Sequence, residues 1–203
     1  MRSKALLFLA VVSLGLAAGQ SLRAQEKPAA GAPTAGYRAE FLDELASYEQ
    51  KFTRLAEAMP AGKYSWRPGE GVRSAGEVFA HIAMANYFIA RALGTPIPAG
   101  IDPQAFGASA NDKAKTVQAL KNSFAQFRQA ILALSDADAD KPQKMFGHQT
   151  TLRGSFILIS GHMGEHLGQS IAYARINGVV PPWTEDQQQR QQQEKKQQEK
   201  PKQ

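Results

Sequence analysis

The sequence predicts an all-α fold, namely a four-helix bundle with long connections between the helices. Apolar residues recur at intervals of three and four in four separate segments, which is the spacing of helices that each bury one face. No segment shows the regular alternation of apolar and polar residues that would predict a strand. Helices of this kind bury their apolar stripes against one another, and bundles place functional sites between facing helices.

The first helix is predicted from Tyr37 to Met59, because Pro60 and Gly62 follow directly. Its apolar stripe consists of Tyr37, Phe41, Leu45, Tyr48, Phe52, Leu55 and Met59. The loop from Ala61 to Arg73 then carries Trp66. Packing of Trp66 over the bundle as a loop anchor is the simpler interpretation, and contact with a substrate is the alternative.

The second helix is predicted to begin at Ser74 and to end near Leu93. Ser74 and Glu77 have the spacing of a capping box, in which the serine caps the helix and the glutamate reaches back to the serine backbone. The apolar stripe consists of Val78, His81, Ile82, Ala85, Phe88, Ile89 and Ala92. A loop from Thr95 to Ala110, too long for a simple hairpin, separates this helix from the next.

Two further helices complete the predicted bundle. The third begins at Asn111 or Asp112, and the fourth extends from Thr150 to the Asn-Gly pair that ends at Gly178. The third stripe consists of Val117, Leu120, Phe124, Phe127, Ile131 and Leu134, and the fourth of Leu152, Phe156, Ile159, Met163, Ser170, Tyr173 and Ile176. Residues 135–149 are predicted to be a connecting loop.

Residues 1–24 are predicted to be a secretory signal peptide. Arg2 and Lys4 precede an apolar run from Ala5 to Ala18, which is shorter than the roughly 20 residues needed to span a bilayer. We expect cleavage after Ala24, so that the mature protein is periplasmic or secreted and free of the membrane. Retention of the segment as an N-terminal anchor is the alternative.

Residues 37–183 form the single predicted domain. Residues 25–36 are rich in Ala, Pro and Gly and are predicted to be a flexible linker. Residues 184–203 are almost entirely Gln, Glu, Lys and Arg and have no apolar side chain to bury. This tail is therefore predicted to be disordered, with a polar helix as the alternative.

The composition restricts the chemistry that the domain can perform. The 203 residues include no cysteine, which excludes disulfides, thiolate metal ligands and a cysteine nucleophile. The formal net charge of +6 falls to +2 in the rest of the chain, because the signal peptide contributes +3 and the tail +1. A domain of such balanced charge offers no basic surface for a nucleic acid, and we expect none to bind.

Three of the four histidines are candidate metal ligands. His162 and His166 are one helical turn apart, so their imidazoles lie side by side and can chelate a divalent metal ion. His81 lies on the buried stripe of the second helix and is the candidate third ligand. Taken alone, His81 is more simply interpreted as a hydrogen-bonded core residue. The His162 and His166 pair, taken alone, fits metal ligands and an ordinary polar face equally well. His148 follows Gly147 in a loop and is expected to be solvent-exposed.

The sequence resembles the DinB/YfiT-like superfamily of small four-helix-bundle metalloproteins over about Tyr37 to Pro182. The motifs that carry the resemblance are Trp66-Arg67-Pro68, the segment Ser74 to Ile82, and His162-x-x-x-His166-x-x-Gln169. The closing segment, residues 173–182, is similar to that of a secreted branch of this family. The resemblance implies that His81, His162 and His166 bind one divalent metal ion, most often zinc or nickel.

Three histidine ligands leave a coordination position open to water or to a substrate. The resemblance then implies a metal-dependent hydrolase or a thiol-dependent transferase that acts on a small molecule, and export favours the hydrolase because low-molecular-weight thiols are mainly cytosolic. Glu77, Glu165, Gln169 and Tyr173 are candidate assisting residues, although each also has a purely structural interpretation. No catalytic residue is assigned.

Two other functions remain open at this point. The first is a binding module without turnover, in which the metal only stabilises the bundle. The second is a haem protein that uses His81 with His162 or His166, where the haem would be non-covalent because the sequence has no Cys-x-x-Cys-His motif. Whatever its function, the assembly that we consider for the protein is a homodimer.

Overall fold

The structure is a computed structural model that describes residues 32–198. The described residues belong to one unit by their contacts, and the helices of the bundle lie within it. The predicted signal peptide, most of the predicted linker and residues 199–203 lie outside the described residues. Within the described range, no helix combines the length and the hydropathy needed to cross a membrane.

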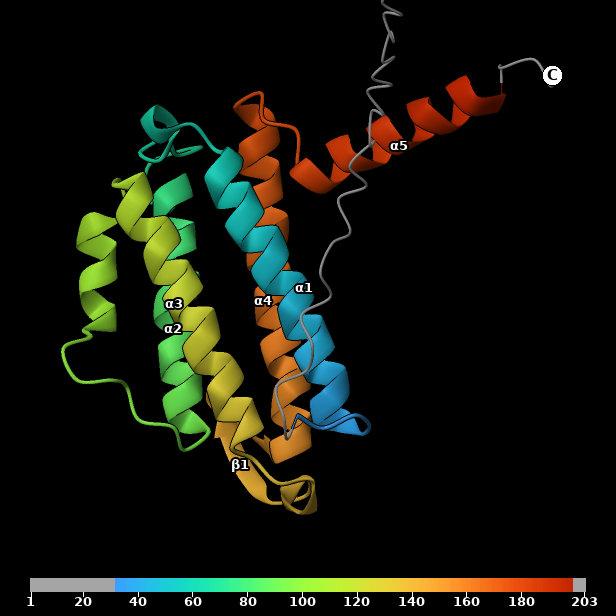
Figure 1. Ribbon diagram of the computed structural model, residues 1–203. Helices are drawn as coiled ribbons and strands as arrows, with labels where there is room; N and C mark the ends of the chain where they lie inside the picture. The colour runs from blue at the N-terminus through green and yellow to red at the C-terminus, as the bar shows by residue number, and fades with distance from the viewer. Residues whose placement is uncertain (1–31, 199–203) are drawn as a thin grey trace, which may run out of the picture. The chain divides into compact units, whose positions relative to one another are not determined.

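Four long helices run side by side in the described part of the chain (Figure 1). They are α1 (Tyr37–Ala58), α2 (Ala75–Ala92), α3 (Lys113–Leu132) and α4 (Leu152–Ile176). Helix α3 packs against both α2 and α1, and α4 packs against both α1 and α2. The prediction of a four-helix bundle is confirmed, and the seam between α2 and α4 is where the candidate site lies.

The core is built largely from the predicted apolar stripes. Phe41 of α1 stacks on Phe156 of α4 with ring centroids 4.2 Å apart, and most other stripe residues are buried. Ile176 was expected to be buried but is 67% exposed, because it lies in the last turn of α4. Two residues outside the predicted stripe of α2, Phe79 and Tyr87, are buried. Helix α2 contacts α3 and the short helix η2 as well as α4, so more than one of its faces is covered.

Short 3₁₀ helices occupy three of the connections. They are η1 (Ala61–Lys63), η2 (Pro103–Ser109) and η3 (Asp136–Asp138). The residue after η2, Ala110, lies so close to Gly76 that a Cβ atom on Gly76 would be 2.0 Å from the Ala110 carbonyl oxygen. Only glycine therefore allows the start of α2 to pack against this connection.

The predicted helix ends agree with the structure. The Ser74 hydroxyl accepts a hydrogen bond from the Glu77 backbone N–H, and the Glu77 carboxylate accepts one from the Ser74 backbone N–H at 2.6 Å, which completes the capping box. Asp112 caps α3, and Gly178, with a φ of 76°, follows the end of α4. These ends fix the position of every side chain on α2 and α4 relative to the bundle.

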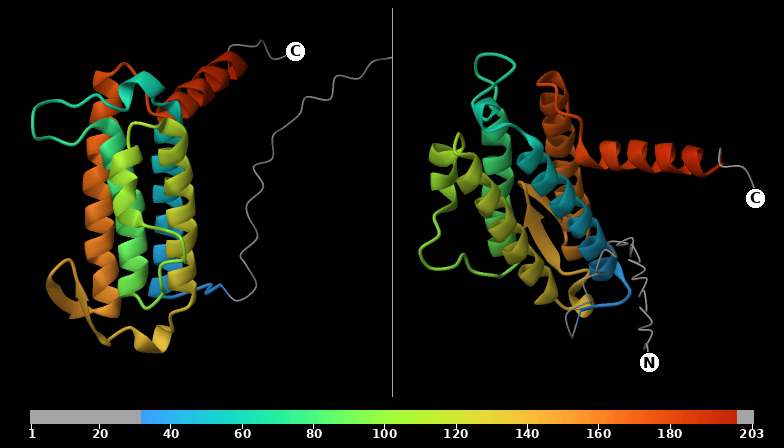
Figure 2. Two further views of the ribbon diagram at one scale, coloured as in Figure 1. Left: turned by 90° about the vertical axis from the view of Figure 1, so that its left-hand side faces the viewer. Right: turned by 45° about the horizontal axis from the view of Figure 1, so that its top comes forward.

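A β-hairpin replaces part of the loop predicted at residues 135–149. Strands β1 (Pro142–Met145) and β2 (His148–Thr151) are antiparallel, and they lie beside the start of α4 (Figure 2). The two turn residues, Phe146 and Gly147, have φ values of 49° and 85°, as a tight hairpin turn of the primed type requires. The expectation of no strand was wrong. Met145 is the one buried residue of the two strands, so the sequence shows almost no alternation of apolar and polar residues there.

The tail contains a helix, α5 (Pro182–Gln198), where the sequence analysis expected disorder from residue 184. Pro182 occupies the first helical position, which suits its fixed φ. Trp183 packs against the hydrophobic core, and the Arg54 guanidinium forms two hydrogen bonds to the Asp186 carboxylate, at 2.8 and 3.1 Å. These contacts hold the first turn of α5, so the polar helix considered as the alternative describes the segment better.

Candidate metal centre

The structure brings together the three histidines that the sequence analysis selected. His81 projects from α2, and His162 and His166 project from consecutive turns of α4. One nitrogen from each ring lies within 4.8 Å of the other two, and the ring centroids are 4.7–5.4 Å apart. His148 lies apart from them, at the start of β2, and is exposed as expected.

The closest approach within this cluster fits a shared metal ion. The Nε2 atoms of His81 and His162 are 3.3 Å apart. Two nitrogen ligands that bind one zinc ion tetrahedrally at about 2.0–2.1 Å are separated by about 3.3–3.4 Å. The Nδ1 atoms of the same two rings are buried and have no hydrogen-bond partner in the described protein.

The protonation state of two of these rings also suits a cation. Burial, the Arg73 guanidinium and the other two histidines lower the pKa of His81 to about 4. Burial, His166 and Arg73 lower the pKa of His162, also to about 4. Both imidazoles are therefore neutral at pH 7, and a neutral imidazole has the free lone pair that a metal ion requires.

A chain of polar contacts orients the third ring. His166 Nδ1 lies 2.9 Å from Gln169 Oε1, and because the amide oxygen can only accept, Nδ1 carries the proton. The Gln169 amide nitrogen in turn donates to the Tyr173 hydroxyl at 2.9 Å, and the Tyr173 ring meets Trp66 edge-on at 5.3 Å. This arrangement leaves His166 Nε2 as the atom with a free lone pair, as in the supporting contacts of known metal-binding histidines.

The chain clarifies the roles of several candidate residues. Gln169 and Tyr173 form a chain of hydrogen bonds that begins at His166 Nδ1, so both can position the ring. Trp66 touches Tyr173, which agrees with the interpretation of Trp66 as a loop anchor. Glu165 is exposed to solvent.

Glu77 is engaged away from the histidines. Its carboxylate binds the Ser74 backbone and, at 3.2 Å, the Arg67 guanidinium. The Ser74 backbone hydrogen bond and the charge of Arg67 hold the pKa of Glu77 below its ordinary value. In the described part of the chain, the side-chain hydrogen bonds and ring contacts of the three histidines involve only one another, Gln169 and Phe146, so no carboxylate is hydrogen-bonded to the cluster.

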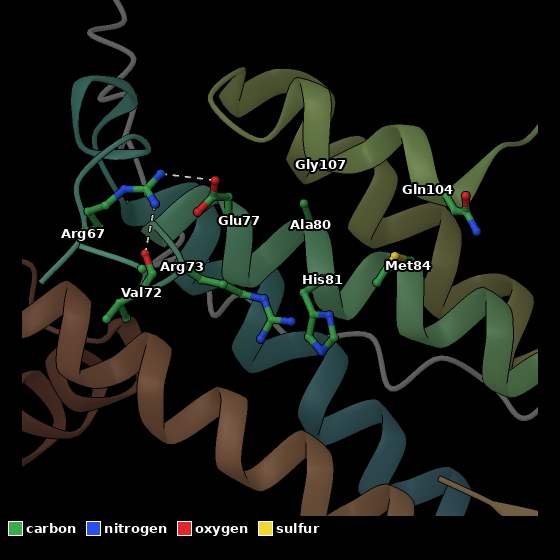
Figure 3. Close-up of a pocket in the computed structure, with 10 residues that line it drawn as sticks. Arg67, Val72, Arg73, Glu77, Ala80, His81, Met84, Gln104 and Gly107 are labelled. Atoms are coloured by element: carbon green, nitrogen blue, oxygen red, sulfur yellow. Dashed lines mark hydrogen bonds and ion pairs between the residues drawn. The ribbon is translucent and has the colours of Figure 1, made fainter. Parts of the chain in front are cut away.

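Two residues near the cluster were missed by the sequence analysis. The Phe146 ring, at the tip of the hairpin, lies 5.0 Å from the His162 ring and is 46% exposed. Arg73, in the loop before α2, extends its guanidinium toward His81 (Figure 3). The hairpin was not predicted, so nothing in the sequence placed Phe146 near a histidine. Arg73 directly precedes the cap residue of α2, two turns before His81, and this spacing was the signal that could have identified it.

Comparison with known proteins supports the same fold. A sequence model of the DinB superfamily matches residues 44–170, a range that includes all three histidines. A DinB-like protein from Bacillus cereus ATCC 10987 is 19% identical, with a TM-score of 0.56 over 70% of this chain and 93% of that one. YfiT from Bacillus subtilis, described as a probable metal-dependent hydrolase with an unusual four-helix bundle topology, is 16% identical, with a TM-score of 0.55 over 70% of this chain and 89% of that one. Comparison with curated proteins gives no match.

Proposed function

Because the chain belongs to the DinB superfamily, we propose that it is a metal-dependent hydrolase of a small molecule, with one divalent ion held by His81, His162 and His166. The observation that carries the proposal is the convergence of three imidazoles, one nitrogen from each within 4.8 Å of the others. A set of three imidazole nitrogens suits zinc and nickel, which are the ions that we expect.

The residues of the chain have separate tasks in this proposal. His81 and His162 offer neutral rings, and Gln169 holds His166 in the tautomer that leaves Nε2 free. An ion with three protein ligands has an open position and supplies Lewis acidity there. The pocket that His81 lines has a volume of about 360 Å³, which is large enough for a small substrate.

Two considerations favour hydrolysis over thiol-dependent transfer. YfiT, which shares the fold, is described as a probable metal-dependent hydrolase. We also propose that residues 1–24 direct export and are removed after Ala24, as in a secreted branch of the superfamily, which places the protein where low-molecular-weight thiols are scarce. Intact mass of protein from its native host tests the export proposal, because a cytosolic protein that retains Met1 would contradict it.

A second candidate function is a binding module in which the metal stabilises the bundle without turnover. The observation that favours it is the lack of any carboxylate hydrogen-bonded to the three histidines among the described residues, since a carboxylate often serves as the general base of a metallohydrolase. The hydrolase would then need a base supplied by the substrate or by solvent.

The experiment that tests the function begins with protein purified without a histidine tag. Elemental analysis should find one zinc or nickel ion per chain. The loaded protein, the chelator-treated protein and His81→Ala are then assayed on a panel of small esters, amides and lactones. Hydrolysis by the loaded protein alone supports the hydrolase. Stoichiometric metal without turnover of any substrate supports the binding module. If the wild type takes up no metal when zinc or nickel is supplied, both functions are excluded.

A further inference from the structure

The pocket beside His81 has a distinct chemical character. Its volume is about 360 Å³, and its charged lining consists of Arg67, Arg73 and Glu77, next to His81 (Figure 3). Two arginines and one glutamate give this lining a net charge of +1. Met84 and Gln104 also line the pocket. Met84 offers an apolar surface to a small organic ligand, and Gln104 offers a polar group.

The two arginines differ in what they bind. Arg67 donates to the Val72 carbonyl oxygen at 3.0 Å and to the Glu77 carboxylate at 3.2 Å, so its charge is used within the protein. Arg73 has no hydrogen bond or ion pair with any residue that the structure describes, and its side chain is exposed at the pocket. Its guanidinium points toward the His81 ring (Figure 3), and the Glu77 carboxylate of the same pocket pairs with Arg67.

The electrostatic balance at this place is unfavourable without an anion. Arg73 and His81 line the same pocket, and the Arg73 guanidinium extends toward the His81 ring (Figure 3). A divalent ion on three neutral imidazoles would add two positive charges beside Arg73. No carboxylate is hydrogen-bonded to the histidines in the described chain, and Glu77 is already paired with Arg67. An anionic group of a substrate would supply a negative charge at this place.

We propose that Arg73 determines substrate specificity by binding a carboxylate group of the substrate, whose scissile bond lies at the histidine cluster. This inference rests on the proposed function and names the substrate class, a small carboxylate-bearing molecule. The planar guanidinium presents two parallel N–H donors that match a carboxylate. A phosphate group carries more charge and usually recruits several donors, whereas this pocket offers a single uncommitted arginine, which favours the carboxylate.

The test uses zinc-loaded protein and succinate, with neutral succinamide as the matched probe and inorganic phosphate as the competing anion. Binding is measured by calorimetry for the wild type, Arg73→Gln, Arg73→Lys and Arg91→Gln. Arg91 is exposed, its guanidinium lies 5.0 Å from the Phe88 ring, and it does not line the pocket, so it controls for a general loss of positive charge. Zinc content and melting temperature are recorded for each variant, because loss of a residue that only binds the substrate should leave both unchanged.

We expect Arg73→Gln to weaken succinate binding roughly 10- to 100-fold, which is the range for loss of a charge-assisted pair. Arg73→Lys should fall between Arg73→Gln and the wild type, since it keeps the charge and loses the paired donors. Arg91→Gln should bind succinate with the affinity of the wild type. The affinity of the wild type for succinamide should be no higher than the affinity of Arg73→Gln for succinate.

Several results would overturn the inference. Equal succinate affinity in the wild type and Arg73→Gln, both fully loaded with zinc, would reject the role of Arg73 in substrate binding. The proposed function would then still stand. Failure of the wild type to bind succinate, or Arg73-dependent binding of phosphate that is tighter than that of succinate, would reject the carboxylate. If the wild type binds no divalent metal, the proposed function fails, and the same titrations on metal-free protein decide whether Arg73 binds a carboxylate.

Discussion

The Nε2 atom of His81 lies 3.3 Å from the Nε2 atom of His162, although 81 residues separate the two in the sequence. The contact exists because α2 and α4 are neighbours in the bundle and each presents its histidine to the seam between them. In the absence of an ion, two neutral rings in this position can form at most one hydrogen bond between their Nε2 atoms, so they gain little from each other.

Metal affinity should depend on all three rings of the cluster. Replacement of His81, His162 or His166 by alanine is expected to lower zinc affinity by more than about 100-fold, because loss of a ligand exceeds the 10- to 100-fold effect of losing a supporting residue. Competition titration against a chelator measures the affinity. His148→Ala is the control, because His148 is exposed in the hairpin and should leave the affinity unchanged. Full affinity in His81→Ala would remove α2 from the site.

The contact between Gln169 and His166 should also affect the metal. Gln169→Ala removes the acceptor that fixes the protonated Nδ1 atom, so we expect zinc affinity to fall about 10- to 100-fold with the fold retained. Gln169→Glu keeps an acceptor and should bind zinc at least as well as the wild type. Tyr173→Phe removes only the partner of the Gln169 amide nitrogen and should have a smaller effect. Equal affinities in Gln169→Ala and the wild type would contradict this role.

The metal-free protein should lose stability as the pH falls from about 6.5 toward 4. The pKa values of His81 and His162 are lowered to about 4 in the folded protein, against about 6.5 in the unfolded chain. The unfolded state therefore binds more protons in this window, so the stabilisation present above pH 6.5 is lost on acidification. We expect a loss on the order of 2 kcal/mol per histidine, after allowance for screening by solvent.

Urea unfolding at pH 7 and pH 4.5 measures this effect. Glu77, Asp112 and Asp136 also have lowered pKa values and lose stabilisation at low pH, so the wild type must be compared with a variant that keeps them. The double variant His81→Gln/His162→Gln meets this condition. The two proteins should differ in their pH dependence, and parallel curves would show that the two rings are not held neutral by the fold.

Gly76 should tolerate no side chain. A Cβ atom there would lie 2.0 Å from the Ala110 carbonyl oxygen and 2.9 Å from the Tyr64 ring, so backbone must move. We expect Gly76→Ala to lower the free energy of unfolding by about 3 kcal/mol or more. Gly161→Ala, at an exposed position on α4 with no atom within 4 Å, should instead raise it by up to about 1 kcal/mol. Chemical denaturation of both variants checks the contrast.

Removal of residues 184–203 should change the melting temperature by only a few degrees. The deletion breaks the ion pair between Arg54 and Asp186, which is partly exposed and contributes at most about 1 kcal/mol. Trp183 remains and still packs against the core. Trp183→Ala should therefore lower the melting temperature more than the deletion does. A large drop on deletion would show that α5 docks through more than this pair.

The sequence predicted those features that depend on regular spacing or on local chemistry. Helical periodicity located the four long helices, and the Ser74–Glu77 pattern located the start of α2 to the residue. The histidine cluster followed because His81 lies on a buried stripe and the other two are one turn apart. For the helices and the cap, the controlling interactions lie within one helix. The pairing of His81 with the two histidines of α4 depends on the packing of two helices, and it was implied by the resemblance to a known family.

The features that were missed depend on contacts between distant segments. The hairpin is too short and too polar to show a pattern, and its turn places Phe146 at a positive φ that few residues with a side chain adopt. Burial of Tyr87 results from contact with Phe106 in η2, at a ring separation of 5.8 Å. The helix at the tail begins where Trp183 and Asp186 meet the bundle, which the local composition does not indicate.

The separation of the ligands along the chain also constrains when the metal can be acquired during biosynthesis. A growing chain that has emerged only as far as α3 carries His81 without its partners, so the complete site cannot form before α4 has been made. If the chain is exported, as proposed, and crosses the membrane unfolded, α4 reaches the outer compartment after α1, α2 and α3. The ion bound would then be selected by the supply of that compartment and not by the metal pool of the cytoplasm.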